Sequence, residues 1–183
     1  MGLWQHAFAL LPTVLLAAQA ALAGVPETAD AARFPVYHKL GPDLAASGQP
    51  TAEGLAELKA LGFRTVVNLR TEAEGAAAER AVVQGQGLVY VNVPITHEGF
   101  ALADVEAVQK VIEDKAAGPV LLHCASSNRV GAVWAVVQAQ QGRSLEEALA
   151  AGREAGLQSP VMVDAVRRVV AGLVAKAPPA AKP

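Results

Sequence analysis

The sequence lacks several features, and each absence excludes a class of protein. Only one of its 183 residues is cysteine, which excludes an intramolecular disulfide and any metal site built from several thiolates. Fifteen Lys and Arg residues against 17 Asp and Glu give a net charge of -2, so the chain lacks the basic excess typical of nucleic-acid-binding proteins. Aromatic residues make up only 4% of the chain, so we expect an Ala-rich, slender core. This length suits one domain with short tails.

Positive charge is also absent from the N-terminal segment, where no Lys or Arg precedes Arg33. Residues 7–23 form a nearly continuous apolar run that ends in Ala21-Leu-Ala23, small residues at the -3 and -1 positions of a cleavage site. The run is shorter than the roughly 20 apolar residues of a membrane span. We therefore expect residues 1–23 to be a signal peptide cleaved after Ala23, which predicts a periplasmic or secreted protein without stable membrane insertion. An uncleaved N-terminal anchor in the inner membrane is the alternative.

The C-terminal end predicts a second segment outside the folded domain. Residues 176–183 contain three prolines and no hydrophobic periodicity, which is typical of a disordered tail. Residues 24–34 form a lead-in, and residues 35–175 contain no internal repeat or linker. We therefore expect a single domain over residues 35–175, and a monomer.

The domain alternates strand and helix patterns. Apolar, β-branched runs predict buried strands, and their continuous hydrophobicity suits a sheet covered on both faces. Alternation of strands with helices predicts an α/β fold with three layers, in which helices cover both faces of a central, mostly parallel sheet. The expected strands are 35–38, 65–69, 88–93 and 119–123, and the expected helices are 52–61, 75–84, 102–117, 130–141, one from 144, and 160–174.

The most informative segment joins the strand at 119–123 to the helix that follows it. Cys124 comes directly before a short polar loop, and Arg129 opens the helix. Unpaired N–H groups and the dipole at a helix N-terminus favour an anion there, and the guanidinium adds positive charge. Both effects favour the thiolate, which is the nucleophilic form of cysteine. The loop amides and Arg129 can also hold a tetrahedral oxyanion, so the sequence predicts a nucleophile and an anion site in one loop.

We expect the residues next to Cys124 and Arg129 to support these two side chains. We expect the side chain of His123 to point away from Cys124 and to shape the loop through hydrogen bonds with nearby backbone. Neither a metal ion nor an organic cofactor is implied. The expected substrate-binding positions are Ala125, Ser126, Ser127, Asn128 and Val130, although Ser126 and Ser127 are equally explained as turn residues.

These residues resemble the signature of the tyrosine and dual-specificity cysteine phosphatases. More closely, the chain is similar, over about residues 35–170, to the bacterial phosphatase-like domain family of beta-lactamase-hydrolase-like proteins. The resemblance implies a phosphatase-like α/β fold and an enzyme that hydrolyses a phosphorylated small molecule or phosphoprotein. It further implies that Cys124 forms a cysteinyl-phosphate and that Arg129 binds phosphate. The matching segments are Ala46-Ser-Gly-Gln-Pro50, Gly62-Phe-Arg-Thr-Val-Val-Asn-Leu-Arg70, Val91-Asn-Val-Pro94 and His123-Cys-Ala-Ser-Ser-Asn-Arg-Val-Gly131.

The loop nevertheless departs from the phosphatase signature. Four residues, not five, separate Cys124 from Arg129, Ser127 stands in place of a loop glycine, and Val130 replaces a hydroxyl residue. The shorter spacing resembles rhodanese sulfurtransferases, whose loop carries a persulfide. Two alternatives therefore remain open: a sulfurtransferase that uses a persulfide on Cys124, and a catalytically weak anion-binding or thiol-sensing module.

A phosphatase also needs an acid that protonates the leaving oxygen. No aspartate stands at an obvious position, so we search the segment that follows the strand at 88–93. Glu98 is our first candidate, His97 the second and Asp104 the third. A role as a solvated loop or helix-cap residue explains each of them equally well.

Charged residues also follow the strand at 65–69. Arg70, Glu72 and Glu74 stand close together in the sequence there. One interpretation places these side chains in the same crevice as Cys124; the interpretation we favour is an exposed ion pair, which contributes little to stability.

Overall fold

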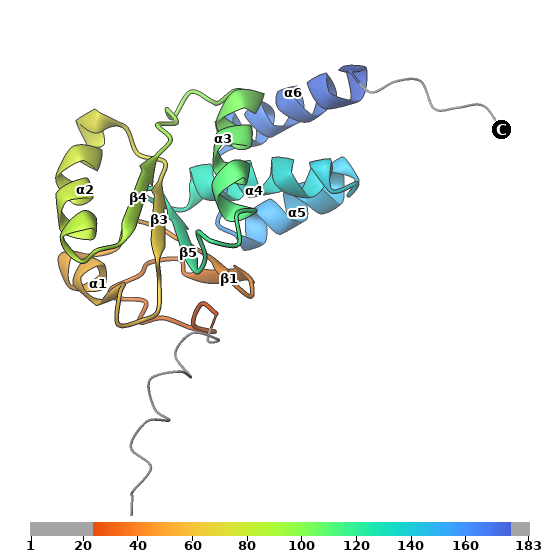
Figure 1. The fold of residues 1–183 in the computed structure, drawn as a ribbon. Coiled ribbons are helices and arrows are strands. Elements are labelled where there is room, and N and C mark those ends of the chain that lie inside the picture. The colour runs from red at the N-terminus through yellow and green to blue at the C-terminus, as the bar shows by residue number, and fades with distance from the viewer. Residues whose placement is uncertain (1–23, 177–183) are drawn as a thin grey trace, which may run out of the picture.

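The computed structural model describes residues 24–176 (Figure 1). The predicted signal peptide, residues 1–23, lies outside the described residues, as do residues 177–183 of the predicted tail. Lys176, the first residue of that predicted tail, is the last residue of a helix. Within residues 24–176, no helix is both long and apolar enough to cross a bilayer.

A five-stranded sheet forms the centre of the domain, in the order β1-β2-β5-β3-β4. β1 is antiparallel to β2, and all other neighbours are parallel. His123, the last residue of β5, pairs with Ser47 on one side and Asn68 on the other. The residue that follows β5 therefore lies at the middle of the carboxyl edge of the sheet, where open α/β sheets bind ligands. The strands are β1 (His38–Gly41), β2 (Leu44–Ser47), β3 (Thr65–Asn68), β4 (Val89–Asn92) and β5 (Val120–His123).

Helices cover both faces of the sheet and make three layers (Figure 1). The predicted three-layer α/β architecture with a mostly parallel sheet is confirmed. One face carries α1 (Ala52–Glu57) and α2 (Ala76–Gly85); the other carries α3 (Leu102–Ile112), α4 (Asn128–Gln140), α5 (Leu145–Glu154) and α6 (Pro160–Lys176), while the short 3-10 helix η2 (Glu72–Glu74) follows β3.

The central strands bury side chains on both faces, as their continuous hydrophobicity predicts. Leu121 packs in the core beneath α1 and α2, whereas Leu122 packs in the core beneath α3, α4 and α6. Small residues then allow two helices to touch through their backbones. A Cβ atom at Gly131 of α4 would lie 2.4 Å from the carbonyl oxygen of Gly152 in α5, so both positions need glycine. This contact draws the end of α5 towards the start of α4.

Several element boundaries differ from the sequence-based expectation. The sequence does not predict β2, because Leu44-Ala-Ala-Ser47 has no β-branched residue. The segment nevertheless forms a strand, because it pairs with β1 on one side and β5 on the other. No strand forms over 35–38, because the backbone of Val36 is left-handed (φ 54°) and β1 begins only at His38. α3 ends at Ile112 instead of residue 117. A turn follows the helix, in which Asp114 accepts a hydrogen bond from the N–H of Ala116.

Candidate active site

The loop between β5 and α4 brings Cys124 and Arg129 to one buried position. Cys124 has no exposed surface, and Arg129 is 2% exposed. Ser127, directly before α4, has a left-handed backbone (φ 64°, ψ -2°). The replacement of a loop glycine by serine therefore falls where the backbone needs the conformation that glycine tolerates best. A hydrogen bond of 2.8 Å from Ser127 Oγ to the carbonyl of Ala155 anchors this turn to the end of α5.

The loop is held by its oxygen atoms, while its N–H groups are left without protein partners. The carbonyl of Ala125 accepts a hydrogen bond of 3.0 Å from the backbone of Gln49. Asn128 Oδ1 accepts hydrogen bonds from the backbone N–H groups of Gln158 and Ser159, both at 2.7 Å. Among residues 24–176, no protein acceptor pairs with the backbone N–H groups of positions 125–129. Such a run of unpaired amides at a helix start suits an anion.

Arg129 is clamped by a carboxylate from another part of the chain. Its Nη1 and Nη2 atoms donate to Glu74 Oε2 and Oε1 at 2.8 and 2.6 Å. Nη1 also donates to the carbonyl of Ile95 at 2.8 Å. Burial lowers the pKa of Arg129, but Glu74 and the sulfur of Cys124 outweigh it and raise the pKa above its ordinary value. The same ion pair lowers the pKa of Glu74 to about 2, so both groups are charged at neutral pH.

These contacts leave one edge of the guanidinium for a ligand. A guanidinium has five N–H donors, two on each terminal nitrogen and one on Nε. Glu74 and Ile95 take both donors of Nη1, which also lies 3.4 Å from the carbonyl oxygen of Leu69, and Glu74 takes one donor of Nη2. The Nε donor and the second Nη2 donor share the remaining edge, and the nearby sulfur of Cys124 is among the groups that raise the pKa of Arg129. The guanidinium can therefore bind an oxyanion through this edge.

His123 lies on the opposite side of the sheet from Cys124, as expected. Its Nε2 atom is 2.7 Å from Glu79 Oε1 on α2, and its Nδ1 atom is 3.4 Å from the carbonyl oxygen of Cys124. Glu79 is 5% exposed and also accepts hydrogen bonds from Asn68 and Gln49. Burial raises the pKa of Glu79, but His123, Gln49 and the charge of Arg70 bring it below its ordinary value. A buried polar network thus supports the strand end that carries the loop.

The predicted exposed ion pair of Arg70 with Glu72 and Glu74 is wrong. Arg70 instead hydrogen-bonds Gln49 and lies 3.5 Å from Glu79 Oε2. Glu74 turns the other way, to Arg129, because Glu74 also accepts hydrogen bonds from the backbone and hydroxyl of Thr71 at 2.9 Å. This cap fixes the turn with the carboxylate facing α4.

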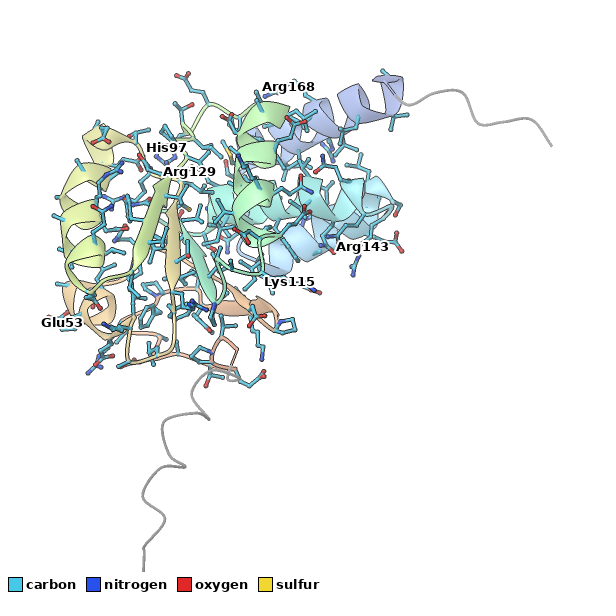
Figure 2. The ribbon with its side chains drawn as sticks, in the orientation of Figure 1. Glu53, His97, Lys115, Arg129, Arg143 and Arg168 are labelled. Carbon is cyan, nitrogen blue, oxygen red and sulfur yellow. The ribbon has the colours of Figure 1, made fainter. Side chains whose placement is uncertain are left out.

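The three candidate acids occupy different surroundings. Glu98 is exposed, and its backbone N–H is bonded to Thr96 Oγ1. Asp104 caps α3, where its carboxylate accepts a hydrogen bond of 2.8 Å from the N–H of Ala101. His97 is also exposed, but its Nε2 atom lies 3.5 Å from Glu74 Oε1, and Figure 2 shows it beside Arg129.

The remaining predicted positions divide between surface and core. Ala125 and Ser126 are exposed on the loop, whereas the side chain of Val130 packs in the core and leaves only its backbone for a ligand. Across residues 24–176, no three His, Cys, Asp or Glu side chains group as metal ligands would.

Sequence reasoning missed the buried carboxylate of Glu79, and it placed Glu74 near the crevice only as the alternative to an exposed ion pair. Glu74 belongs to the capping pattern Thr71-x-x-Glu74, and the strand before it lies beside β5. The cap was visible in the sequence as a Thr with a Glu three residues later. Neither pattern nor spacing shows that Glu74 faces Arg129, which lies 55 residues further along the chain.

Comparison with known proteins agrees with this geometry. The sequence profile described as "Beta-lactamase hydrolase-like protein, phosphatase-like domain" matches residues 36–141. The chain belongs to this family. A "Beta-lactamase hydrolase-like protein" of Xylella fastidiosa is 34% identical over 105 residues, which cover 55% of this chain and 24% of that protein. The chain thus matches about a quarter of the length of its curated relatives.

Solved structures share the fold of this phosphatase-like domain. TpbA of P. aeruginosa has a TM-score of 0.60 at 25% identity, covering 79% of this chain and 88% of TpbA. The core catalytic domain of the PP-IP phosphatase SIW14 from S. cerevisiae has a TM-score of 0.60 at 13% identity, covering 73% of this chain and 85% of that domain. The resemblance inferred from the sequence is confirmed, and with it the phosphatase-like fold.

Proposed function

We propose that this domain is a cysteine-dependent phosphatase that hydrolyses phosphate monoesters. One observation carries the proposal. The Nε donor and the second Nη2 donor of Arg129 are not used by Glu74 or Ile95, and Cys124 is close enough to raise the pKa of the guanidinium. The loop between these two residues has N–H groups without an acceptor among the described residues. This combination offers a nucleophile and an oxyanion site within one loop.

The reaction follows from the charges that the site can stabilise. The Cys124 thiolate attacks phosphorus, so that an S–P bond forms while the ester O–P bond breaks. The free edge of Arg129 and the amides of positions 125–129 hold the charge spread over the equatorial oxygens. Water then attacks the cysteinyl-phosphate, which releases inorganic phosphate and returns the thiolate.

The proposed substrate is a phosphorylated small molecule or a phosphoprotein. A Cys-to-Ser variant of TpbA is known in complex with pTyr, and SIW14 is a PP-IP phosphatase. These two ligand classes differ greatly in size, so the fold alone selects neither. We further propose that the domain acts in the periplasm or outside the cell, on the basis of the apolar segment that ends at Ala23.

A sulfurtransferase is the second candidate, because four residues separate Cys124 from Arg129. A loop of that length has one amide fewer than the phosphatase signature. In that reaction Cys124 would carry a persulfide and pass its outer sulfur to an acceptor.

The deciding experiment assays the chain and its Cys124→Ser variant with p-nitrophenyl phosphate under reducing conditions. We expect release of p-nitrophenol by the native chain only, and a phosphate adduct on Cys124 in mass spectra of acid-quenched samples. Thiocyanate formation from thiosulfate and cyanide would instead identify a sulfurtransferase. Binding of inorganic phosphate that is lost in Arg129→Ala, without turnover of either substrate, would identify an anion-binding module.

A further inference from the structure

A general acid must stand close to the oxyanion site while its own proton remains available. It has to reach the oxygen that leaves phosphorus, on the side opposite the attacking sulfur. A residue whose acidic group is tied up in another structural bond cannot do this. Both conditions can be checked for each acidic group on the segment that follows β4.

That segment is attached directly to the guanidinium. The carbonyl of Ile95 accepts a hydrogen bond of 2.8 Å from Arg129 Nη1, and the N–H of Ile95 donates to the carbonyl of Leu69 at 3.0 Å. Thr96 and Gly99 then pair across a tight turn whose two central residues are His97 and Glu98. The turn is thus anchored one residue before it starts, at the anion-binding side chain itself.

Within this turn, only one side chain contacts the ion pair of Arg129. His97 Nε2 lies 3.5 Å from Glu74 Oε1, the same oxygen that accepts from Arg129 Nη2 at 2.6 Å. Glu98 has no side-chain hydrogen bond within residues 24–176, and the carboxylate of Asp104 is used in capping α3. Figure 2 shows His97 and Arg129 at the same end of the sheet.

The distance also leaves the imidazole proton uncommitted. Hydrogen bonds from nitrogen to oxygen span about 2.7–3.2 Å, so 3.5 Å places the ring near the carboxylate without a full bond. The exposed side chain of His97 remains free to turn towards a ligand held by Arg129.

We infer that His97 is the general acid of the reaction proposed above, and that Glu74 positions both His97 and Arg129. The inference rests on the phosphatase function. In the first step, the protonated ring gives a proton to the ester oxygen as the O–P bond breaks and the S–P bond forms. In the second step, the neutral ring takes a proton from water as the new O–P bond forms and the S–P bond breaks. Each cycle thus restores the thiolate and the protonated ring.

The test compares two substrates that differ in how much they need an acid. p-Nitrophenolate leaves without strong need of a proton, whereas phenolate is a much poorer leaving group. We expect His97→Gln to lower kcat/KM for phenyl phosphate by about 10²- to 10⁴-fold. The fold-loss for p-nitrophenyl phosphate should be smaller by a factor of about ten or more. Glu98→Gln, which removes the competing candidate acid in the same turn, should leave the ratio of the two substrates unchanged.

The outcomes separate this inference from the function on which it rests. If the native chain shows no turnover that depends on Cys124, that result contradicts the phosphatase function itself. If the native chain is active, equal losses on both substrates in His97→Gln show that His97 is not the acid. A loss specific to phenyl phosphate in Glu98→Gln would move the role to Glu98. Thermal unfolding of both variants checks that folding is unchanged, as expected for two exposed side chains.

Discussion

Glu74 binds both terminal nitrogens of Arg129 from a turn 55 residues earlier in the chain. The guanidinium is therefore oriented by the turn after β3 and not by its own helix. Because both donors of Nη1 and one donor of Nη2 are occupied, the edge formed by Nε and Nη2 is left for a ligand. The ion pair decides which way the anion site faces.

Loss of the Glu74 charge should therefore affect binding and catalysis. Glu74→Gln keeps an oxygen for the Thr71 cap but no longer holds the guanidinium by charge. We expect kcat/KM for p-nitrophenyl phosphate to fall by roughly tenfold to hundredfold, since small errors of placement cost about that much. Glu72→Gln, an exposed change in the same turn, is the control and should leave the rate constant unchanged. Equal rates for both variants would show that Arg129 orients itself without Glu74.

The same pair predicts a dependence of stability on pH. The pKa of Glu74 falls from 4.5 to about 2 in the folded chain, mainly through its hydrogen bond with Arg129. A lowered carboxyl pKa contributes stability above its unfolded value and loses it as pH falls through the folded value. Urea unfolding should therefore show a constant deficit of Glu74→Gln near neutral pH that shrinks between 4.5 and about 2. A deficit that persists unchanged to the lowest pH would contradict the charge-based account.

The glycine that packs against the loop gives a separate test. Gly156 has φ 102°, and a Cβ atom there would lie 2.6 Å from the Cβ of Ser127. Gly142 has a similar φ of 93° but open space around it, so it isolates the backbone cost. We expect Gly142→Ala to cost about 1 kcal/mol in chemical unfolding, and Gly156→Ala to cost more and to lower phosphatase activity. Equal effects on stability and activity would mean that the loop does not depend on this contact.

The buried carboxylate beneath the loop should matter chiefly for folding. Glu79→Ala removes the partner of His123 and Asn68 from a site that is 5% exposed. Breaking a buried pair in this way costs about 3–5 kcal/mol in the free energy of unfolding. Glu106→Ala, an exposed change on α3, should stay within about 0.5 kcal/mol. A loss below about 1 kcal/mol for Glu79→Ala would show that the network contributes little.

The sequence predicted what depends on local patterns, and missed what depends on contacts between distant segments. Strand patterns and the order Cys124, loop, Arg129 place the nucleophile at the end of a buried strand, and the structure has it there. Ser127 stands in place of a loop glycine in the sequence, and its backbone is left-handed in the structure. β2 and the partner of Arg129 escaped prediction, because each is determined by a neighbour far away in the sequence.

The two halves of the loop differ in how they are fixed, and this limits how its length can change during evolution. Ser127 and Asn128 are tied to the α5–α6 connection by three hydrogen bonds, and Gly156 packs against Ser127. Ala125 and Ser126 are exposed. The carbonyl of Ala125 is held by the backbone of Gln49, so an inserted residue that restores the five-residue phosphatase spacing is accommodated most easily at Ser126. Relatives with the long and the short loop should then superimpose at the helix start and diverge next to the cysteine.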